Sequence, residues 1–87
     1  MILKDRIAIV TGAGSGIGRA GARALALEGA NVIVADLSAE KGGETVAFIA
    51  AEGGRASALA TDVTDDAQLA ELIARTVRDF GRLDILH

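Results

Sequence analysis

The stretch TGAGSGIGRAG, from Thr11 to Gly21, contains five of the eleven glycines in the chain. It follows the apolar run IAIV (residues 7–10) and leads into a segment whose apolar residues recur at helical spacing. A glycine-rich turn between a buried strand and a helix suits nucleotide binding, because the backbone can approach a phosphate and the helix N-terminus favours an anion. The stretch therefore predicts a nucleotide-binding loop, and the spacing of its glycines indicates which kind.

The segments around this loop alternate between strand and helix patterns. Short apolar runs rich in β-branched residues predict strands buried on both faces of a parallel sheet, and helical spacing predicts the crossovers between them. The order β-α-β-α-β-α-β predicts an α/β fold with two helices on one face, one on the other, and much of the sheet uncovered. The predicted strands cover residues 7–10, 32–35, 55–62 and 83–87. The predicted helices cover residues 16–28, 38–52 and 65–80, and Thr64 is the predicted N-cap of the third helix.

Two of the predicted helices carry features that bear on their packing. Gly42 and Gly43 each cost about 1 kcal/mol relative to alanine in a helix interior, so the second helix is expected to start late or to fray. The remaining apolar positions predict the buried side of each helix. They are Val46, Ile49 and Ala50 in the second helix and Leu69, Leu72, Ile73, Val77 and Phe80 in the third.

The composition argues against several classes of function. The 87 residues have a net charge of −3, two aromatic residues and no cysteine, which argues against a basic nucleic-acid groove and against a thiolate metal site. No apolar run approaches the roughly 20 residues of a membrane span, and the start MILKDR is charged too early for a signal peptide. One small cytoplasmic domain without a metal site is expected.

The glycines of the loop match more than one nucleotide-binding pattern. G-x-G-x-x-G occurs at residues 16, 18 and 21, but its first glycine should directly follow the strand, and Gly16 lies well beyond Val10. G-x-G-x-G occurs at residues 12, 14 and 16, as in methyltransferases that bind S-adenosylmethionine. Those usually carry an acidic residue at the end of the first strand, where this chain has Val10 and Thr11. Since Asp36 still fits that class, an S-adenosylmethionine-binding domain stays as a lesser alternative.

The third pattern, T-G-x-x-x-G-x-G, joins Thr11, Gly12, Gly16 and Gly18. In this pattern the chain resembles the N-terminal part of the short-chain dehydrogenase/reductase family, which implies a partial Rossmann-type sheet that binds a nicotinamide dinucleotide. Gly12 permits the sharp exit from the strand, Gly16 lets the backbone approach the pyrophosphate, and Gly18 allows close packing of helix on strand. The pyrophosphate is then expected at the helix N-terminus.

Other residues of the loop receive narrower roles. The Ser15 hydroxyl and the Ile17 backbone N–H are candidate phosphate donors, and the Thr11 hydroxyl is expected to tie the loop down. Gly14 and Gly21 are interpreted as loop and packing residues.

Asp36 indicates which dinucleotide the loop would serve. It ends the second predicted strand, 24 residues after Gly12, where a carboxylate can accept hydrogen bonds from both hydroxyls of the adenosine ribose and repel a 2′-phosphate. Members of the family that prefer NADP commonly have a basic residue at the position of Ser15 or Leu37, and neither is basic here. Arg19 is expected to point to solvent. The sequence therefore favours NAD over NADP.

Asp62 and Val63 follow the third predicted strand. The resemblance implies that this pair meets the adenine, with the Asp62 carboxylate toward the exocyclic amine and the Val63 backbone toward the ring. From the residues alone, an aspartate before a capped helix serves equally well as a turn residue.

The residues of the family's proton transfer are absent from this chain. The resemblance implies a catalytic Ser and a Tyr-x-x-x-Lys pair, but the chain has no tyrosine, and its lysines, Lys4 and Lys41, lie outside any such pattern. His87 has no partner placed by spacing and is read as a bystander. We therefore expect the cofactor-binding fragment of an oxidoreductase acting on a small alcohol or ketone, or else a free-standing NAD-binding module. Either is expected to form homo-oligomers or to associate with the missing remainder.

Overall fold

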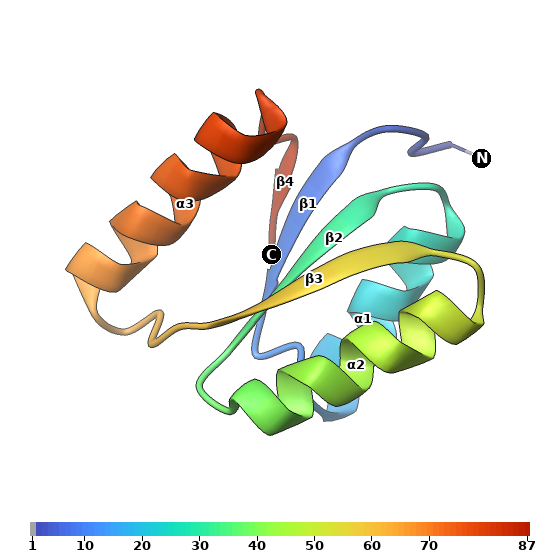
Figure 1. The fold of residues 1–87 in the computed structure, drawn as a ribbon, viewed down its shortest axis with the longest axis horizontal. Coiled ribbons are helices and arrows are strands. Elements are labelled where there is room, and N and C mark those ends of the chain that lie inside the picture. Colours follow the sequence, from blue (N-terminus) through green and yellow to red (C-terminus); the bar gives the residue numbers. More distant parts are fainter. Residues whose placement is uncertain (1) are drawn as a thin grey trace.

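The computed structural model describes residues 2–87 and contains one parallel sheet. The strands lie in the order β3-β2-β1-β4, so the first strand lies inside the sheet and the two edges of the sheet are formed by β3 and β4 (Figure 1). This arrangement confirms the predicted α/β fold. The strands are β1 (Ile7–Thr11), β2 (Asn31–Asp36), β3 (Arg55–Ala60) and β4 (Ile85–Leu86).

Three helices connect these strands and cover both faces of the sheet. The helices are α1 (Gly16–Leu27), α2 (Ala39–Ala51) and α3 (Asp66–Phe80). Helices α1 and α2 lie on one face and α3 lies on the other, as predicted (Figure 1). No helix within residues 2–87 has the length and apolar character needed to cross a membrane.

The core lies mainly between the sheet and the pair α1–α2. Val10, Val32 and Val34 point to this face and contact small side chains of α1, which allows α1 to pack close to the strands. On the other face, Ile9 and Ile33 contact Leu72 of α3. Alternate residues of the same strands therefore serve the two layers, which explains why their sequences read as continuous apolar runs.

Helix α2 differs from the sequence prediction at its start and on its buried side. It begins at Ala39 without a delay, because the side chain of Ser38 caps it by accepting a hydrogen bond from the Lys41 N–H at 3.1 Å. Gly42 is buried, and a β-carbon there would lie 3.4 Å from the β-carbon of Ala58 on β3. The glycine thus permits close packing on the sheet. The prediction for Ala50 was wrong, since this residue is exposed.

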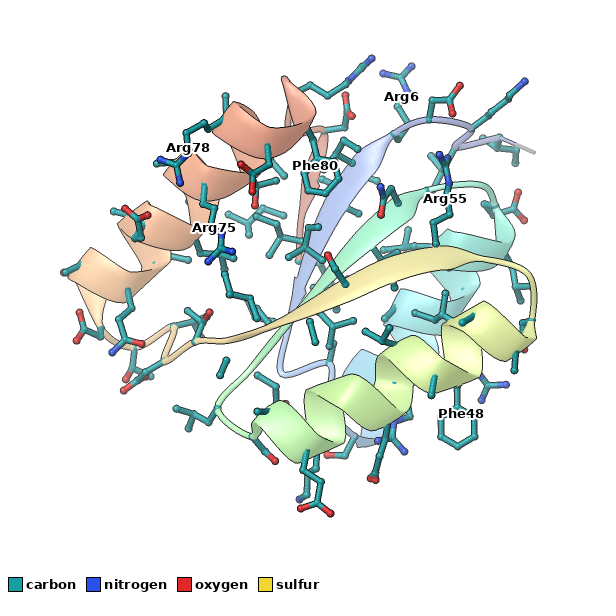
Figure 2. All side chains as sticks on the ribbon, viewed as in Figure 1. Arg6, Phe48, Arg55, Arg75, Arg78 and Phe80 are labelled. Atoms are coloured by element: carbon teal, nitrogen blue, oxygen red, sulfur yellow. The ribbon has the colours of Figure 1, made fainter. Side chains whose placement is uncertain are left out.

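Helix α3 begins and packs differently from the prediction. Its N-cap is Asp65 and not Thr64, because the Asp65 carboxylate accepts hydrogen bonds from the N–H groups of Ala67 and Gln68. Val77 and Phe80 were predicted to be buried but are 44% and 38% exposed. In Figure 2, Arg75 lies on the side of α3 toward the sheet and Arg78 on the outer side. The buried residues of α3 are Leu72 and Thr76, which lie four positions apart, so the helix covers the sheet along little more than one turn.

Candidate functional site

A cleft lies at the carboxyl ends of β1, β2 and β3, where ligands bind in open parallel sheets. Its volume is about 170 Å³. Five residues that were predicted to bind the cofactor line it together with Ala35, Thr61 and Thr64. The five are Gly12, Asp36, Leu37, Asp62 and Val63. The four other predicted residues do not line this cleft. They lie at the start of α1, which follows Gly12 in the chain, and are Ser15, Gly16, Ile17 and Gly18.

The glycine loop adopts a conformation that other residues would resist. Gly12 and Gly16 have φ values of +62° and +59°, in the left-handed region that glycine enters at little cost. Gly18 has ordinary dihedrals but no room for a side chain, since a β-carbon there would lie 2.1 Å from the Gly12 carbonyl oxygen. Two of these glycines therefore set the path of the loop, and the third lets the helix approach it.

The N-terminus of α1 differs from those of the other two helices. Its N-cap, Ser15, makes no side-chain capping bond, and its first turn contains no acidic residue. In contrast, α2 and α3 are capped by side chains and carry Glu40 and Asp66 in their first turns. Ile17 of α1 is 90% exposed. The first-turn N–H groups of α1, which lack intrahelical partners, thus remain available to an anion.

Asp36 connects the glycine loop to the start of α2. One carboxylate oxygen accepts a hydrogen bond from the Gly14 N–H at 2.9 Å, and the other accepts one from the Ser38 N–H at 2.9 Å. A carboxylate has further lone pairs, so it can accept additional bonds from a ligand. A β-carbon on Gly14 would lie 2.7 Å from the Asp36 carboxylate. Gly14 is therefore more than a loop residue, which its spacing in the sequence did not indicate.

Asp62 forms a local turn at the entrance to α3. One of its carboxylate oxygens accepts hydrogen bonds from the Thr64 N–H at 2.9 Å and from the Thr64 hydroxyl at 2.5 Å. These bonds lower the pKa of the Asp62 carboxyl. The side chain of Gln68, which the sequence did not single out, accepts the Asp62 N–H at 2.9 Å. Asp62 thus acts as a turn residue and also lines the cleft.

Two other expectations for the loop need revision. Arg19 does not point to solvent: its side chain is only 22% exposed, and its guanidinium donates to the Gly14 carbonyl and to the Thr45 hydroxyl. The Thr11 hydroxyl donates to the carbonyl of His87 at 3.0 Å and so ties β1 to the end of β4. The order of residues along the chain does not reveal either contact.

The sequence profile of short chain dehydrogenases matches residues 6–87. An uncharacterized oxidoreductase of Thermotoga maritima is 45% identical over 86 residues, which are 99% of this chain and 34% of that protein. The 2,3-dihydro-2,3-dihydroxybenzoate dehydrogenase of Bacillus subtilis is 43% identical, over 97% of this chain and 32% of that protein. The chain thus spans about a third of the length of these relatives.

Solved structures give the same result for the fold. A metagenomic short-chain oxidoreductase in complex with NADP superposes with a TM-score of 0.95 at 35% identity, over 99% of this chain and 39% of the other. A hydroxysteroid dehydrogenase from Escherichia coli superposes with a TM-score of 0.92 at 38% identity, over 97% of this chain and 36% of the other.

Proposed function

This chain belongs to the short-chain dehydrogenase family, and on that premise we propose that it is the NAD-binding portion of an oxidoreductase. The observation that carries the proposal is the convergence of the glycine loop, Asp36 and the Asp62–Val63 turn at one edge of the sheet. When bound, the nicotinamide of NAD would supply hydride transfer to or from an alcohol or ketone carbon. The chain itself supplies binding and orientation.

The residues at this edge can be matched to the pyrophosphate, the ribose and the adenine of a dinucleotide. The uncapped N-terminus of α1, with Ser15 and Ile17, would bind the pyrophosphate. Asp36 would accept the ribose hydroxyls, with Leu37 beside it, and Asp62 and Val63 would meet the adenine. Gly12, Gly16 and Gly18 would keep β-carbons away from the phosphates.

The preference for NAD over NADP rests on charge. A 2′-phosphate at the ribose would meet the Asp36 carboxylate, which is already oriented by two backbone N–H groups. Arg19, a basic residue that contacts the loop, is held by Gly14, Thr45 and Lys41 and is poorly placed to neutralise that phosphate. A related structure contains NADP, so membership of the family by itself leaves the choice open. Asp36 is what favours NAD.

The chain alone is expected to bind NAD without turning over a substrate. It has no tyrosine to exchange a proton with the substrate. The absence of tyrosine also supports a second candidate, a free-standing NAD-binding module. An activity assay distinguishes the two candidates. If the chain is a portion of an oxidoreductase, adding the catalytic part of a relative that pairs with it should produce turnover, whereas a free-standing module should remain inactive.

Calorimetric titration with NAD, NADP and S-adenosylmethionine tests the cofactor assignment. We expect weak binding of NAD, weaker binding of NADP by about tenfold, and no binding of S-adenosylmethionine. Adenosine is the matched control, because it lacks the pyrophosphate and should bind less tightly than NAD. Tighter binding of NADP or of S-adenosylmethionine would overturn the assignment.

A further inference from the structure

Two side chains outside the glycine motif reach the carbonyl groups of the loop. Thr45, which is buried in α2, donates its hydroxyl proton to the Ala13 carbonyl oxygen at 2.7 Å. Arg19, in α1, donates from its guanidinium to the Gly14 carbonyl oxygen and through Nε to the Thr45 hydroxyl oxygen at 2.8 Å. Arg19 and Thr45 therefore form one connected network that spans both helices and the loop.

The peptide unit between Ala13 and Gly14 is fixed at both of its ends. Its carbonyl accepts the Thr45 hydroxyl at 2.7 Å, and its N–H donates to the Asp36 carboxylate at 2.9 Å. Because a peptide unit is planar, these two bonds set its orientation about the chain axis. The same peptide unit therefore links Thr45 to the carboxylate that is proposed to bind the ribose.

The next peptide unit, between Gly14 and Ser15, is held from one side only. Its carbonyl accepts a hydrogen bond from the Arg19 guanidinium. In a trans peptide the N–H points opposite to the carbonyl, so the Ser15 N–H is directed away from Arg19. Arg19 is itself positioned by the Lys41 carbonyl at 3.3 Å and by the Phe48 ring, 5.2 Å from its guanidinium carbon.

We propose that Arg19 and Thr45 are positioning residues that fix the glycine loop in the conformation that binds the dinucleotide. Neither contacts the cleft of predicted cofactor residues. Their role is to hold the two peptide units on either side of Gly14, and through them the Asp36 carboxylate and the direction of the Ser15 N–H. This inference rests on the proposed function, since it assigns the network to dinucleotide binding.

Arg23 provides a matched control on the same helix. It lies one turn further from the loop, pairs with Glu52 at 2.8 Å and stacks on the same Phe48 ring at 5.4 Å. Replacing Arg19 or Arg23 by methionine removes one partly exposed guanidinium from α1 in either case. Only Arg19→Met removes a contact with the loop.

The experiment compares NAD affinity among Arg19→Met, Thr45→Val, Thr45→Ser and Arg23→Met. Calorimetry is performed where circular dichroism shows each variant to be folded, so that a purely structural loss of stability leaves the dissociation constant unchanged. We expect Arg19→Met and Thr45→Val to weaken NAD binding about tenfold, as for a lost buried hydrogen bond. Thr45→Ser, which keeps the hydroxyl, should restore most of the affinity, and Arg23→Met should match the unmodified chain.

Hydrogen exchange supplies a second measurement. Backbone amides of residues 12–18 should exchange faster in Arg19→Met than in Arg23→Met, while amides of β1 and β2 remain protected. Because Arg19 lies outside the core, its variant should fold even where Thr45→Val does not.

If the unmodified chain binds NAD and the dissociation constant of Arg19→Met for NAD is within twofold of the unmodified value, the positioning role is wrong and the proposed function stands. If the unmodified chain does not bind NAD, both fail.

Discussion

A β-carbon on Gly18 would lie 2.1 Å from the carbonyl oxygen of Gly12, so the first turn of α1 lies against the turn that leaves β1. The contact joins the first and last glycines of T-G-x-x-x-G-x-G and gives that spacing a steric cause. Because backbone is on the other side of the contact, no side-chain rotation relieves it. The close approach brings the N-terminus of α1 to the carboxyl edge of the sheet.

Gly18→Ala is therefore expected to destabilise the chain by about 3 kcal/mol or more, since helix α1 must move away from β1. Gly21→Ala is the matched control, because Gly21 lies in the same helix and a β-carbon added there would meet no atom within 4 Å apart from its chain neighbours and the nearby backbone of α1. The control should gain about 0.5–1 kcal/mol from the reduced freedom of the unfolded chain. Urea denaturation measures both. Equal effects of the two substitutions would contradict the steric argument.

Asp36→Ala should reduce the preference for NAD over NADP by about tenfold, through loss of the ribose acceptor and of the charge that repels a 2′-phosphate. Asp36 also holds the Gly14 N–H, so loosening of the loop should weaken both cofactors. The ratio of the two dissociation constants is therefore the informative quantity. Asp62→Asn is the control, because Asp62 is proposed to meet the adenine, which both cofactors share. An unchanged ratio in Asp36→Ala would remove Asp36 from the ribose site.

Much of the fold could be predicted because strand burial and helix periodicity are local patterns. The runs at residues 7–10 and 32–35 became β1 and β2, each one residue longer at one or both ends. Asp36 could be proposed from its place at the end of the second strand, whereas Asp62 entered the candidate site only through the resemblance to the family, because the residues alone fit a turn equally well. Register relative to the first strand excluded one of the overlapping glycine motifs, and the residues at the end of that strand, Val10 and Thr11, weakened a second.

The errors arose where contacts join distant parts of the chain. Arg19 was expected in solvent, but Thr45, 26 residues away, accepts its Nε–H. Phe80 was expected in the core because helical spacing identifies an apolar side without showing whether anything covers it. A local error also occurred: the N-cap of α3 was misplaced by one residue, since Thr64 and Asp65 are both residue types found at N-caps and the backbone geometry selects Asp65.

Asp84 is expected to make stability depend on pH. Hydrogen bonds from Arg82 and from the Ile7 N–H lower the pKa of the Asp84 carboxyl from 3.8 to about 2. A carboxyl whose pKa is lower in the folded state stabilises the fold above its unfolded pKa and loses this contribution as the pH falls. The difference in melting temperature between the unmodified chain and Asp84→Asn should therefore narrow between about pH 4 and pH 2. A difference that stays constant over that range would contradict the assignment.

The incompletely covered face of the sheet is expected to make the chain self-associate. Phe80 on α3 is 38% exposed and lines a cleft of about 140 Å³ with Ile33 and Leu59 of the sheet. Burial of this apolar surface against a second copy would be favourable. Sedimentation equilibrium should show an average mass that rises with concentration, and Phe80→Gln should shift the chain toward monomer.

Phe48→Gln is the control, because Phe48 is similarly exposed at 46% but projects from α2, on the opposite side of the sheet (Figure 2). A monodisperse monomer at all concentrations, or equal effects of the two substitutions, would show that this face does not drive association.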